Sequence, residues 1–585
     1  MSPDQERQIL QRVRSQNPPG ADDLYFRRDQ AANGALTIST GAYMNIFHQK
    51  NWRRLTKLAD FRLEVRDSAA GRFDLLSSGP EREPLTVASR RLSGSGERLV
   101  FHLPAEADFC WFDWTPDDSQ GELPEAFYAS EALSSRPEVS LALVVTTFER
   151  ADDLRRLVET YEGTRRENRE IETSTGLYIV NNQPHDVQAL ADLARPGVVL
   201  FHNPVNNGGA GGFSRGAREV VAAGGHSHIV FMDDDILIDP EAWFRTLALL
   251  RNLAPDYAGQ ILAGAMFLRE RPTYCHTMGE AFDKFGLYHN TTGPVDLGGL
   301  RETLTLLSSL DPDAGFPGLE HIPSSAGLRP YAAWWYCAIP VSHFKSRGFP
   351  LPLLFKGDDM EYSFRLNRKI LYLNGICVWH PDFKGKGSDL RNYLEVRNHA
   401  IWVTLHFRRW RLALMMIFAY RLAKFLAAND YSSTAIVIQA LADYRCFHER
   451  REDSVPETAA KLRNCRSRFP NDLAAAAKVG EPLLIPSLPR SRTLDALSVL
   501  AALGGSLIPA RFFRISPLQA PLTQVKGKFP ARYVASPDSS EIKIFNRRRA
   551  FILSLKGLAA LAGFLFPVSF SRKLKNFAAT YGGDQ

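Results

Sequence analysis

Three consecutive aspartates, Asp233 to Asp235, follow the apolar run that ends in "IVFM". Neighbouring carboxylates repel one another, and burial raises their cost further. A divalent cation is the simplest compensation, because hard oxygen ligands suit Mg²⁺ or Mn²⁺, which commonly bridge protein carboxylates to phosphates. Alternate residues of an extended segment face the same side. The spacing therefore predicts that Asp233 and Asp235 share one ion, while Asp234 points elsewhere or contacts a sugar.

A glycine-rich segment, "NPVNNGGAGGFSRG", occupies residues 203–216 shortly before these aspartates. It follows a strand-like run and opens a helix-like one. Gly208, Gly209, Gly211 and Gly212 allow the backbone to approach a ligand closely and supply N–H groups to an anion. The spacing matches neither a dinucleotide-binding GxGxxG nor a P-loop. A flexible turn is the alternative, and the nearby DxD pair favours contact with a diphosphate or sugar diphosphate.

A second acidic cluster lies in "FKGDDMEYSFR", residues 355–365, just before a helical stretch. One acid at a helix N-terminus is often only a partner of the helix dipole. The adjacent pair Asp358 and Asp359 suggests more, because a carboxylate in the same crevice can take a proton from an acceptor hydroxyl. Glu361 belongs to the same cluster, and we expect it near the acceptor.

Aromatic residues and a histidine complete the set of candidates. Trp334 and Trp335, in "YAAWWYCAIP", suit stacking on sugar faces, although tryptophans are more often core residues. His380, in "VWHPDF", follows a strand-like run. We expect it either to complete the metal shell or to hold a phosphate.

The elements that must position these residues follow from the hydrophobic patterns. Residues 22–136 contain short alternating or aromatic runs such as "FRLEVRD" and "DFCWFDWTP", typical of a β-sandwich or barrel. From Pro137, strands alternate with helices in the manner of a parallel, doubly wound sheet, whose ligands bind at the carboxyl ends of the strands. The polar residues that fall at such ends are Thr146, Thr147, Asn181, Asn182, Asn203 and Asp233 to Asp235.

From about His399 onward the pattern is mostly helical. "WRLALMMIFAYRLAKFLAAND" predicts an amphipathic helix, and "TLDALSVLAALGGSLI" a shorter one. We therefore predict a multidomain α/β protein. Its parts are an N-terminal β-sandwich or jelly-roll-like domain over residues 1–136, a central Rossmann-like catalytic domain over 137–400, and a helical C-terminal domain over 401–585.

Composition supports a folded cytoplasmic protein. The 585 residues are 45% apolar and 23% charged, which is typical of globular domains. Six widely spaced cysteines indicate free thiols, and the polar N-terminus lacks the apolar core of a signal peptide. The net charge of +7 is matched by one segment, since Glu541–Asn576 holds eight Lys or Arg and one acid, an excess of 8 − 1 = 7.

That basic segment surrounds the last apolar run, Phe551–Phe570. Its length would just span a bilayer, but Lys556, glycine and proline breaks and basic flanks favour an interfacial segment on anionic headgroups. A core helix pair with a solvated basic edge is the alternative. Nucleic acid is a poor partner, because the basic residues lie beside an apolar tail rather than with exposed aromatics along a groove.

The motifs occur in the order "TTFER", "NNGGAGGFSRG", "FMDDDI", "WWYCAIP", "KGDDMEYSFR", "VWHPDF" and "YLEVRNHA". Together they resemble family 2 glycosyltransferases of the GT-A fold. More closely, they resemble the polymerising galactofuranosyltransferases that extend bacterial cell-wall galactan. The resemblance covers roughly residues 24–410, and the C-terminal region shares only its general architecture.

The resemblance implies roles for individual residues. Asp233, Asp235 and His380 match the metal ligands, and Asp359 matches the catalytic base. The residues that match acceptor-binding positions, or lie beside them, are Trp334, Trp335, Asp358 and Glu361. The residues implied to bind the nucleotide or donor are Thr147, Arg150, Asn182, Asn207, Gly208, Gly209 and Asp234. The run "IVNNQ" departs from the pattern, because many family 2 enzymes place an acid there for the uracil, so Asn181 or Asn182 must serve.

The activity implied is an inverting, Mn²⁺- or Mg²⁺-dependent transfer of galactofuranose from UDP-galactofuranose to a lipid-linked glycan. The enzyme would act peripherally at the cytoplasmic face of the inner membrane. A transferase using another nucleotide sugar, such as UDP-galactose or dTDP-rhamnose, is one alternative. A non-catalytic carbohydrate-binding protein is another, although the intact set of Asp233, Asp235, Asp359 and His380 argues against it. Linkage, polymer length and oligomeric state, a homo-oligomer included, stay open.

Overall fold

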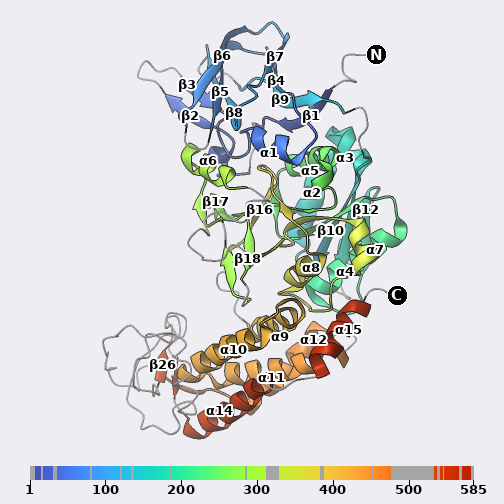
Figure 1. Ribbon diagram of the computed structural model, residues 1–585, viewed down its shortest axis with the longest axis vertical. Coiled ribbons are helices and arrows are strands. Elements are labelled where there is room, and N and C mark those ends of the chain that lie inside the picture. Colours follow the sequence, from blue (N-terminus) through green and yellow to red (C-terminus); the bar gives the residue numbers. More distant parts are fainter. Residues whose placement is uncertain are drawn as a thin grey trace.

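The computed structural model describes most of the chain. The described residues are 7–14, 18–30, 36–79, 82–118, 122–133, 137–182, 188–283, 286–290, 292–310, 328–382, 388–449, 454–475, 533–535, 541–544, 546–564 and 569–581. They form a mixed α/β multidomain structure in which sheets fill the N-terminal and central parts and helices the C-terminal part (Figure 1). The fold class predicted from the sequence is therefore confirmed.

Two antiparallel sheets form the N-terminal part. The first has the strand order β1 (Arg7–Arg12), β9 (Ala126–Glu131), β4 (Phe61–Arg66), β7 (Arg98–His102). The second has the order β2 (Arg27–Gln30), β3 (Leu36–Ser39), β8 (Phe109–Pro116), β5 (Ala70–Ser78), β6 (Leu85–Ser93). Side chains meet between the sheets, as Phe73 of β5 stacks on Phe101 of β7 with ring centroids 5.0 Å apart. The short helix α1 (Gln49–Leu55) contacts β8.

The main central sheet supplies the strand ends that were expected to carry the site. Its order is β12 (Val198–His202), β11 (Thr175–Asn181), β10 (Leu141–Thr147), β13 (His228–Asp233), β22 (Tyr336–Pro340), β15 (Ile261–Ala263), β23 (Ile370–Leu371). The first four strands are parallel, and β22 runs antiparallel to β13. Their carboxyl ends therefore lie along one edge, as the pattern predicted.

Helices connect these strands. They are α2 (Ala151–Glu167), α3 (Arg169–Ser174), α4 (Gly208–Ala223), α5 (Glu241–Asn252) and α7 (Val341–Arg347). The α4 helix packs unusually close to the sheet because it carries glycines one turn apart. A Cβ at Gly212 would lie 1.9 Å from Thr146 Oγ1, and one at Gly216 would lie 2.4 Å from Val144 Cγ1. Several glycines of the "GGAGGFSRG" segment thus serve helix–sheet packing rather than turn flexibility.

A second central sheet brings a distant segment to the aspartates. Its order is β14 (Leu237–Ile238), β24 (Cys377–His380), β16 (Ala265–Leu268), β17 (Arg271–Thr277), β20 (Val295–Asp296). Leu237 pairs with Trp379, so β14, the strand that follows the three aspartates, holds β24 and with it His380 beside them.

The remaining elements of the central part are β19 (Tyr288–Asn290), β18 (Glu280–Phe282) and β21 (Arg329–Tyr331) in a small sheet, with α6 (Leu300–Ser308) and α8 (Asp358–Leu366). Short 3₁₀ turns occur at Asp22–Leu24, Gln188–Leu193, Pro255–Tyr257 and Phe447–Glu449.

The C-terminal part is a helical layer below the central sheets (Figure 1). Its helices are α9 (Asp389–His406), α10 (Trp410–Ala427), α11 (Tyr431–Arg445), α12 (Val455–Arg468), α14 (Arg547–Ala562) and α15 (Ser569–Thr580). The predicted helix at 410–430 is present as α10, and the one at 493–508 lies outside the described residues. A small sheet of β25 (Asp472–Ala475), β27 (Glu541–Ile544) and β26 (Tyr533–Ala535) was not predicted. Helix α9 runs across the predicted domain boundary at residue 400.

The last apolar run forms α14 and the start of α15 rather than one continuous segment. One face of α14 is core, since Leu553 and Leu561 are buried against the other helices. The other face is exposed and apolar, with Phe551, Leu555 and Leu558 between 36% and 46% accessible. Among the helices that the structure describes, none combines the length and hydrophobicity needed to cross a bilayer.

Arg245 of α5 ties the N-terminal part to the central one. Its guanidinium is fully buried and donates to the carbonyls of Met44 at 2.6 Å and Asn374 at 2.9 Å. It also pairs with Glu241 one turn earlier at 3.1 Å, and Glu241 accepts from the Arg12 N–H of β1 at 2.8 Å. A buried cation that is this well satisfied fixes the relative position of the two parts.

We predict that Arg245→Met destabilises the protein by about 3–5 kcal/mol, because it leaves the Glu241 carboxylate buried without its cation. The measurement is the midpoint of urea unfolding. Arg215→Met is the matched control, since Arg215 pairs with Glu219 at the same i,i+4 spacing but both side chains are partly accessible to solvent. The control should change the free energy of unfolding by only about 0.5 kcal/mol. Equal effects of the two substitutions would contradict the anchoring role of Arg245.

Candidate active site

Asp233, Asp235 and His380 converge at the carboxyl end of β13. One ligand atom from each residue lies within 4.8 Å of the others. The His380 Nε2 atom is 3.2 Å from Asp235 Oδ1 and 3.7 Å from Asp233 Oδ2. The sequence placed the two aspartates together by their alternation, and the pairing of β14 with β24 adds the histidine.

The chemistry of this cluster fits a divalent ion. His380 Nδ1 lies 2.6 Å from the carbonyl oxygen of Pro381, which fixes the ring with Nε2 toward the aspartates. A second hydrogen bond of this kind is typical of metal-ligating histidines. Two carboxylate oxygens and one imidazole nitrogen form a set that suits Mn²⁺ or Mg²⁺ and leaves positions for ligand oxygens.

Charge compensation inside the cluster is incomplete. Burial raises the pKa of Asp233, and burial raises the pKa of Asp234 to about 6. Burial opposes the charged imidazole of His380, but its hydrogen bond to Asp235 and the nearby Asp233 outweigh burial, so the pKa of His380 lies above its ordinary value. Excess negative charge at a strand end is the condition under which a cation stabilises a site.

Arg150 supplies a fixed positive charge beside the aspartates. Its Nη1 atom lies 2.9 Å from Asp234 Oδ1 and 2.6 Å from Asp235 Oδ2. Asp234, the middle residue of the three aspartates, therefore turns toward Arg150. The alternation along an extended segment predicted that it would point away from the ion shared by its two neighbours. The guanidinium is partly exposed and lies at the boundary of two cavities.

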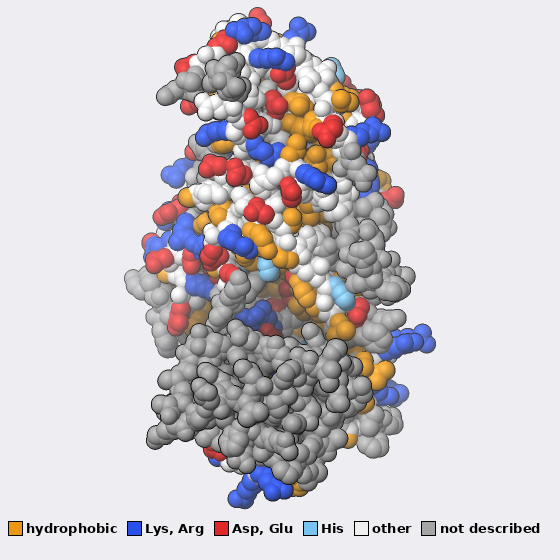
Figure 2. Space-filling model, turned by 90° about the vertical axis from the view of Figure 1, so that its left-hand side faces the viewer, with side chains coloured by type: hydrophobic (Ala, Val, Ile, Leu, Met, Phe, Trp, Pro, Cys, Tyr) orange, Lys and Arg blue, Asp and Glu red, His pale blue; other side chains and the backbone are white. Residues whose placement is uncertain are grey.

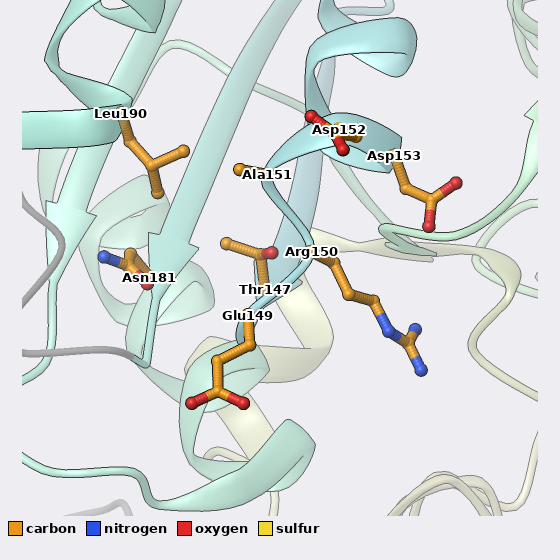
Figure 3. Close-up of a pocket in the computed structure, with 8 residues that line it drawn as sticks. All are labelled: Thr147, Glu149, Arg150, Ala151, Asp152, Asp153, Asn181 and Leu190. Atoms are coloured by element: carbon orange, nitrogen blue, oxygen red, sulfur yellow. The ribbon is translucent and has the colours of Figure 1, made fainter.

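These two cavities share Thr147 and Arg150. The first, of about 390 Å³, is bounded by Thr146, Thr147, Phe148, Arg150, Asn182, Asn206, Gly208, Gly209, Asp233, Asp234, Phe355 and Val455. The second, of about 450 Å³, is bounded by Thr147, Glu149, Arg150, Ala151, Asp152, Asp153, Asn181 and Leu190. Figure 3 shows Asn181 at the end of its strand, with the side chains of Thr147 and Glu149 nearby and Arg150 extending away from them. Most of the predicted strand-end residues thus line these two adjoining cavities, whereas Asn203 and Asp235 line neither.

The glycine segment forms one wall of the first cavity. Asn182 donates to the carbonyl of Gly208 at 3.2 Å and to Thr146 Oγ1 at 2.9 Å, so it holds the segment against the sheet. The backbone N–H of Gly208 donates to Asn206 Oδ1 at 2.8 Å. Asn207, partly exposed, directly precedes α4. The N-terminus of this helix faces the cavity and favours negative charge there.

Asp358 and Asp359 begin helix α8, close to the glycine segment that forms one wall of the first cavity. A Cβ built at Gly209 would lie 4.0 Å from Asp358 Oδ2, so this carboxylate faces the glycine segment. Asp359 is partly accessible and accepts from the Met360 N–H at 2.8 Å. Desolvation by the surrounding protein, followed by repulsion from Asp358, raises the pKa of Asp359 well above its ordinary value. A carboxylate of this kind is a stronger base than an exposed one.

Glu361 is not brought into the crevice with these two residues. Its side chain is fully buried, 2.6 Å from Arg365 Nη2 and 3.1 Å from His406 Nε2. Burial opposes its charge, but Arg365 and His406 outweigh burial and lower the pKa of Glu361 to about 2. The carboxylate links α8 to α9. This structural role explains why a glutamate occurs here, and the contact with the acceptor that we expected for Glu361 is not needed to explain it.

The two tryptophans occupy different environments. Trp334 is 5% exposed and packs among aromatic rings, with centroids 4.7 Å from Phe231 and 5.3 Å from Phe213. Trp335 is partly exposed, and its indole N–H donates to the carbonyl of Gly264 at 2.9 Å. Trp335 alone has surface to offer to a sugar, whereas Trp334 supports the core beneath it.

Sequence reasoning missed several residues of the crevice. Val455 belongs to helix α12 of the C-terminal part, and Phe355 to the loop before α8, yet both line the first cavity. Glu280 of β18 accepts from the Tyr288 hydroxyl at 2.5 Å, and its charge contributes to the raised pKa of Asp359. A lone glutamate in "MGEAF" carries no signal, and Asn206, which also lines the first cavity, was not singled out although it lies in the quoted "NPVNNGG" run.

Comparisons with known proteins agree with this geometry. Residues 142–282 match the family described as Glycosyl transferase family 2. The chain is 26% identical over 461 residues to "Galactofuranosyltransferase GlfT2" of Mycolicibacterium smegmatis, which covers 74% of this chain and 68% of that protein. It is 26% identical over 473 residues to the protein of the same name from Mycobacterium tuberculosis, covering 76% and 71% of the two chains.

Solved structures align with the chain only at low TM-scores. S. aureus TarS 1–349 aligns with a TM-score of 0.31 and 12% identity over 56% of this chain and 88% of that one. The mannosyltransferase PcManGT from Pyrobaculum calidifontis, in complex with GDP-Man and Mn²⁺, aligns with a TM-score of 0.31 and 11% identity over 74% and 88% of the two chains.

The protein is a glycosyltransferase, and the region that matches family 2 carries Asp233 and Asp235 of the acidic cluster at the end of a parallel strand. Within that class, it resembles the polymerising galactofuranosyltransferases, as its motifs indicated.

We predict that Asp235→Asn weakens Mn²⁺ binding roughly 100-fold, because it removes one of three ligands from a small charged site. The measurement is electron paramagnetic resonance of free Mn²⁺ during titration of the protein. Asp234→Asn is the matched control, since it has the same size and charge change but faces Arg150. Equal loss in both variants would mean that net charge, and not ligation, holds the ion.

Proposed function

We propose that this protein transfers galactofuranose from UDP-galactofuranose to a lipid-linked glycan during cell-surface polysaccharide synthesis, with inversion of the anomeric centre. The observation that carries the proposal is the arrangement of one crevice. A cluster suited to a divalent ion lies on one side, and the Asp358–Asp359 pair lies on the other. The similarity to the two galactofuranosyltransferases supports the choice of sugar.

The donor has a complementary environment along the strand ends. Arg150 and the N-terminus of α4 present positive charge to a diphosphate, and the second cavity offers Asn181 and Thr147 to a pyrimidine. A divalent ion held by Asp233, Asp235 and His380 would neutralise charge on the leaving diphosphate. The sugar then extends into the first cavity toward Asp358.

Asp359 is the residue we assign as general base. It takes the proton of the acceptor hydroxyl as that oxygen forms a bond to the anomeric carbon. The bond from this carbon to the diphosphate oxygen breaks, and UDP leaves with the electron pair. A single displacement inverts the configuration, and the raised pKa of Asp359 matches a base that acts on a hydroxyl.

The first test is UDP release with a panel of UDP-sugars and with dTDP-rhamnose, in Mn²⁺ and then in EDTA. A synthetic galactofuranosyl acceptor bearing a lipid chain completes the assay. We expect metal-dependent turnover confined to UDP-galactofuranose. Turnover with a different donor would overturn the substrate and keep the mechanism. If no donor is turned over, failure to bind UDP in the presence of Mn²⁺ would overturn the donor site as well.

Asp359→Asn should abolish transfer and leave UDP binding within about threefold of the wild type, because the base lies across the crevice from the nucleotide cavity. Turnover and calorimetric UDP affinity are the two measurements. Asp256→Asn, at an exposed turn, is the control for an equal charge change. Retained turnover in Asp359→Asn would remove this residue from the role of base.

We further propose that the helical part holds the enzyme peripherally at the cytoplasmic face of the inner membrane. Helices α10 and α14 pack together and leave apolar side chains exposed, among them Leu412, Phe551 and Leu555. Exposed basic residues lie near them in the chain, namely Arg408, Arg409, Arg411, Arg547, Arg548, Arg572, Lys573 and Lys575. Figure 2 shows Lys and Arg side chains at the lower end and edge of the described surface of this part. Apolar residues flanked by basic ones are typical of interfacial binding to anionic lipid.

Replacing Leu412, Phe551 and Leu555 together by serine should lower binding to phosphatidylglycerol-containing vesicles by roughly tenfold or more. Co-sedimentation with vesicles measures this binding. Leu85→Ser with Val87→Ser is the control, because these side chains are equally exposed but lie on β6 of the N-terminal part. Unchanged vesicle binding of the triple variant would remove the membrane surface from α10 and α14.

A further inference from the structure

The motif "YLEVRNHA", residues 393–400, has no part in the chemistry described above. It lies in the middle of α9, and two of its polar residues, Arg397 and Asn398, are fully buried. Buried polar side chains persist when they satisfy other groups, so their partners indicate their purpose. The three carbonyl oxygens that accept hydrogen bonds from the Asn398 amide nitrogen all belong to the loop that precedes Asp358.

That loop, residues 351–357, has a strained backbone. Leu354 and Lys356 both have a φ of 67°, and Gly357 has a φ of 99°. The Phe355 N–H donates to the carbonyl of Leu353 at 3.0 Å, which closes a γ-turn around Leu354. A leucine and a lysine rarely adopt this conformation, and it persists only where surrounding contacts impose it.

Asn398 supplies those contacts. Its Nδ2 atom lies 2.9 Å from the carbonyl oxygens of Leu353 and Phe355 and 2.8 Å from that of Lys356. Arg397 Nε donates to Asn398 Oδ1 at 2.9 Å, which orients the amide with its nitrogen toward the loop. Arg397 also donates to the carbonyl of Leu353 at 3.1 Å. One amide therefore gathers three carbonyls that an extended loop would point apart.

The same loop contacts the donor side of the crevice. The carbonyl of Leu354 accepts from the Ala210 N–H of α4 at 2.8 Å. A Cβ at Gly208 would lie 2.3 Å from this carbonyl oxygen, so loop and glycine segment pack backbone to backbone. Phe355 lines the first cavity, and Asp358 follows directly after Gly357. The loop thus joins the wall of the donor cavity to the acidic pair.

We propose that Asn398 is a positioning residue that holds the 351–357 loop in its left-handed conformation and thereby sets the Asp358–Asp359 pair against the donor cavity. The inference rests on the catalytic role proposed for that pair. Asn398 touches neither donor nor acceptor in this arrangement. Its effect passes through the loop carbonyls, whose positions fix the start of α8.

The first experiment measures amide hydrogen exchange of the full-length protein, with and without Asn398→Ala. We expect exchange of the Phe355 and Ala210 amides to accelerate about tenfold or more, because their acceptor carbonyls lose their fixed positions. Asn398→Asp is a second variant of unchanged shape that keeps the acceptor for Arg397 and loses the donors. Asn45→Ala is the matched control, since Asn45 Nδ2 is equally buried and donates to the carbonyls of Arg14 and Tyr25. Unchanged exchange at Phe355 and Ala210 in both Asn398 variants would overturn the inference.

The second experiment measures kcat and the donor KM separately. Displacement of the base should lower kcat roughly 10- to 100-fold and leave the donor KM within about threefold, because the nucleotide contacts lie on other strands. Asn45→Ala should leave both unchanged. Wild-type kcat in the Asn398 variants, or parallel losses in them and in Asn45→Ala, would contradict a positioning role. If the wild-type protein does not turn over UDP-galactofuranose, the proposed substrate is wrong. The role of Asn398 in holding the loop is tested separately, because the hydrogen-exchange experiment requires no sugar.

Discussion

Carboxylates crowd the carboxyl end of β13 and the facing end of α8, where burial raises the pKa of Asp233, Asp234, Asp358 and Asp359. Negative charge in such a space is stable only if cations reach it. They come from separate parts of the chain: Arg150 after β10, His380 at the end of β24 and Lys356 from the loop before α8. The pairing of strands in the central part brings these groups to the aspartates. The pairing of β14 with β24 is the clearest case: it consists of only two residue pairs, and it places His380 beside the aspartates.

The same requirement explains why the crevice has two dissimilar sides. On the β13 side, Arg150 and His380 lie against the aspartates and oppose the rise in pKa that burial causes in Asp233. On the α8 side, Asp359 lacks so close a cation among the described contacts and is desolvated, so its proton affinity is high. This difference in surroundings supports the different roles proposed for residues of the same type, metal ligands on one side and a base on the other.

Sequence patterns predicted the central part well because its signals are local. An apolar run followed by Thr146, Asn181 or Asp233 marks the end of a parallel strand, and the structure places all of these at one edge. Glu361 and Trp334 show where the motif was insufficient. Both lie within or beside recognisable acidic and aromatic clusters, but Arg365 and His406 engage the first and Phe213 and Phe231 enclose the second. Arg365 lies only one helical turn after Glu361, but His406, Phe213 and Phe231 are far from their partners in the chain, and such distant contacts leave no periodicity to detect.

Val455 at the start of α12 lines the donor cavity, and its backbone N–H donates to the carbonyl of Asn206 at 2.8 Å. Helix α12 therefore contributes to the wall of the first cavity, although the whole of the family 2 match, residues 142–282, lies before it. The protein is consequently less modular than its three-part outline suggests. Exchange of the helical part between related enzymes would also exchange one side of the cavity proposed to hold the donor, so the proposed choice of substrate and the proposed membrane binding depend on the same part of the chain.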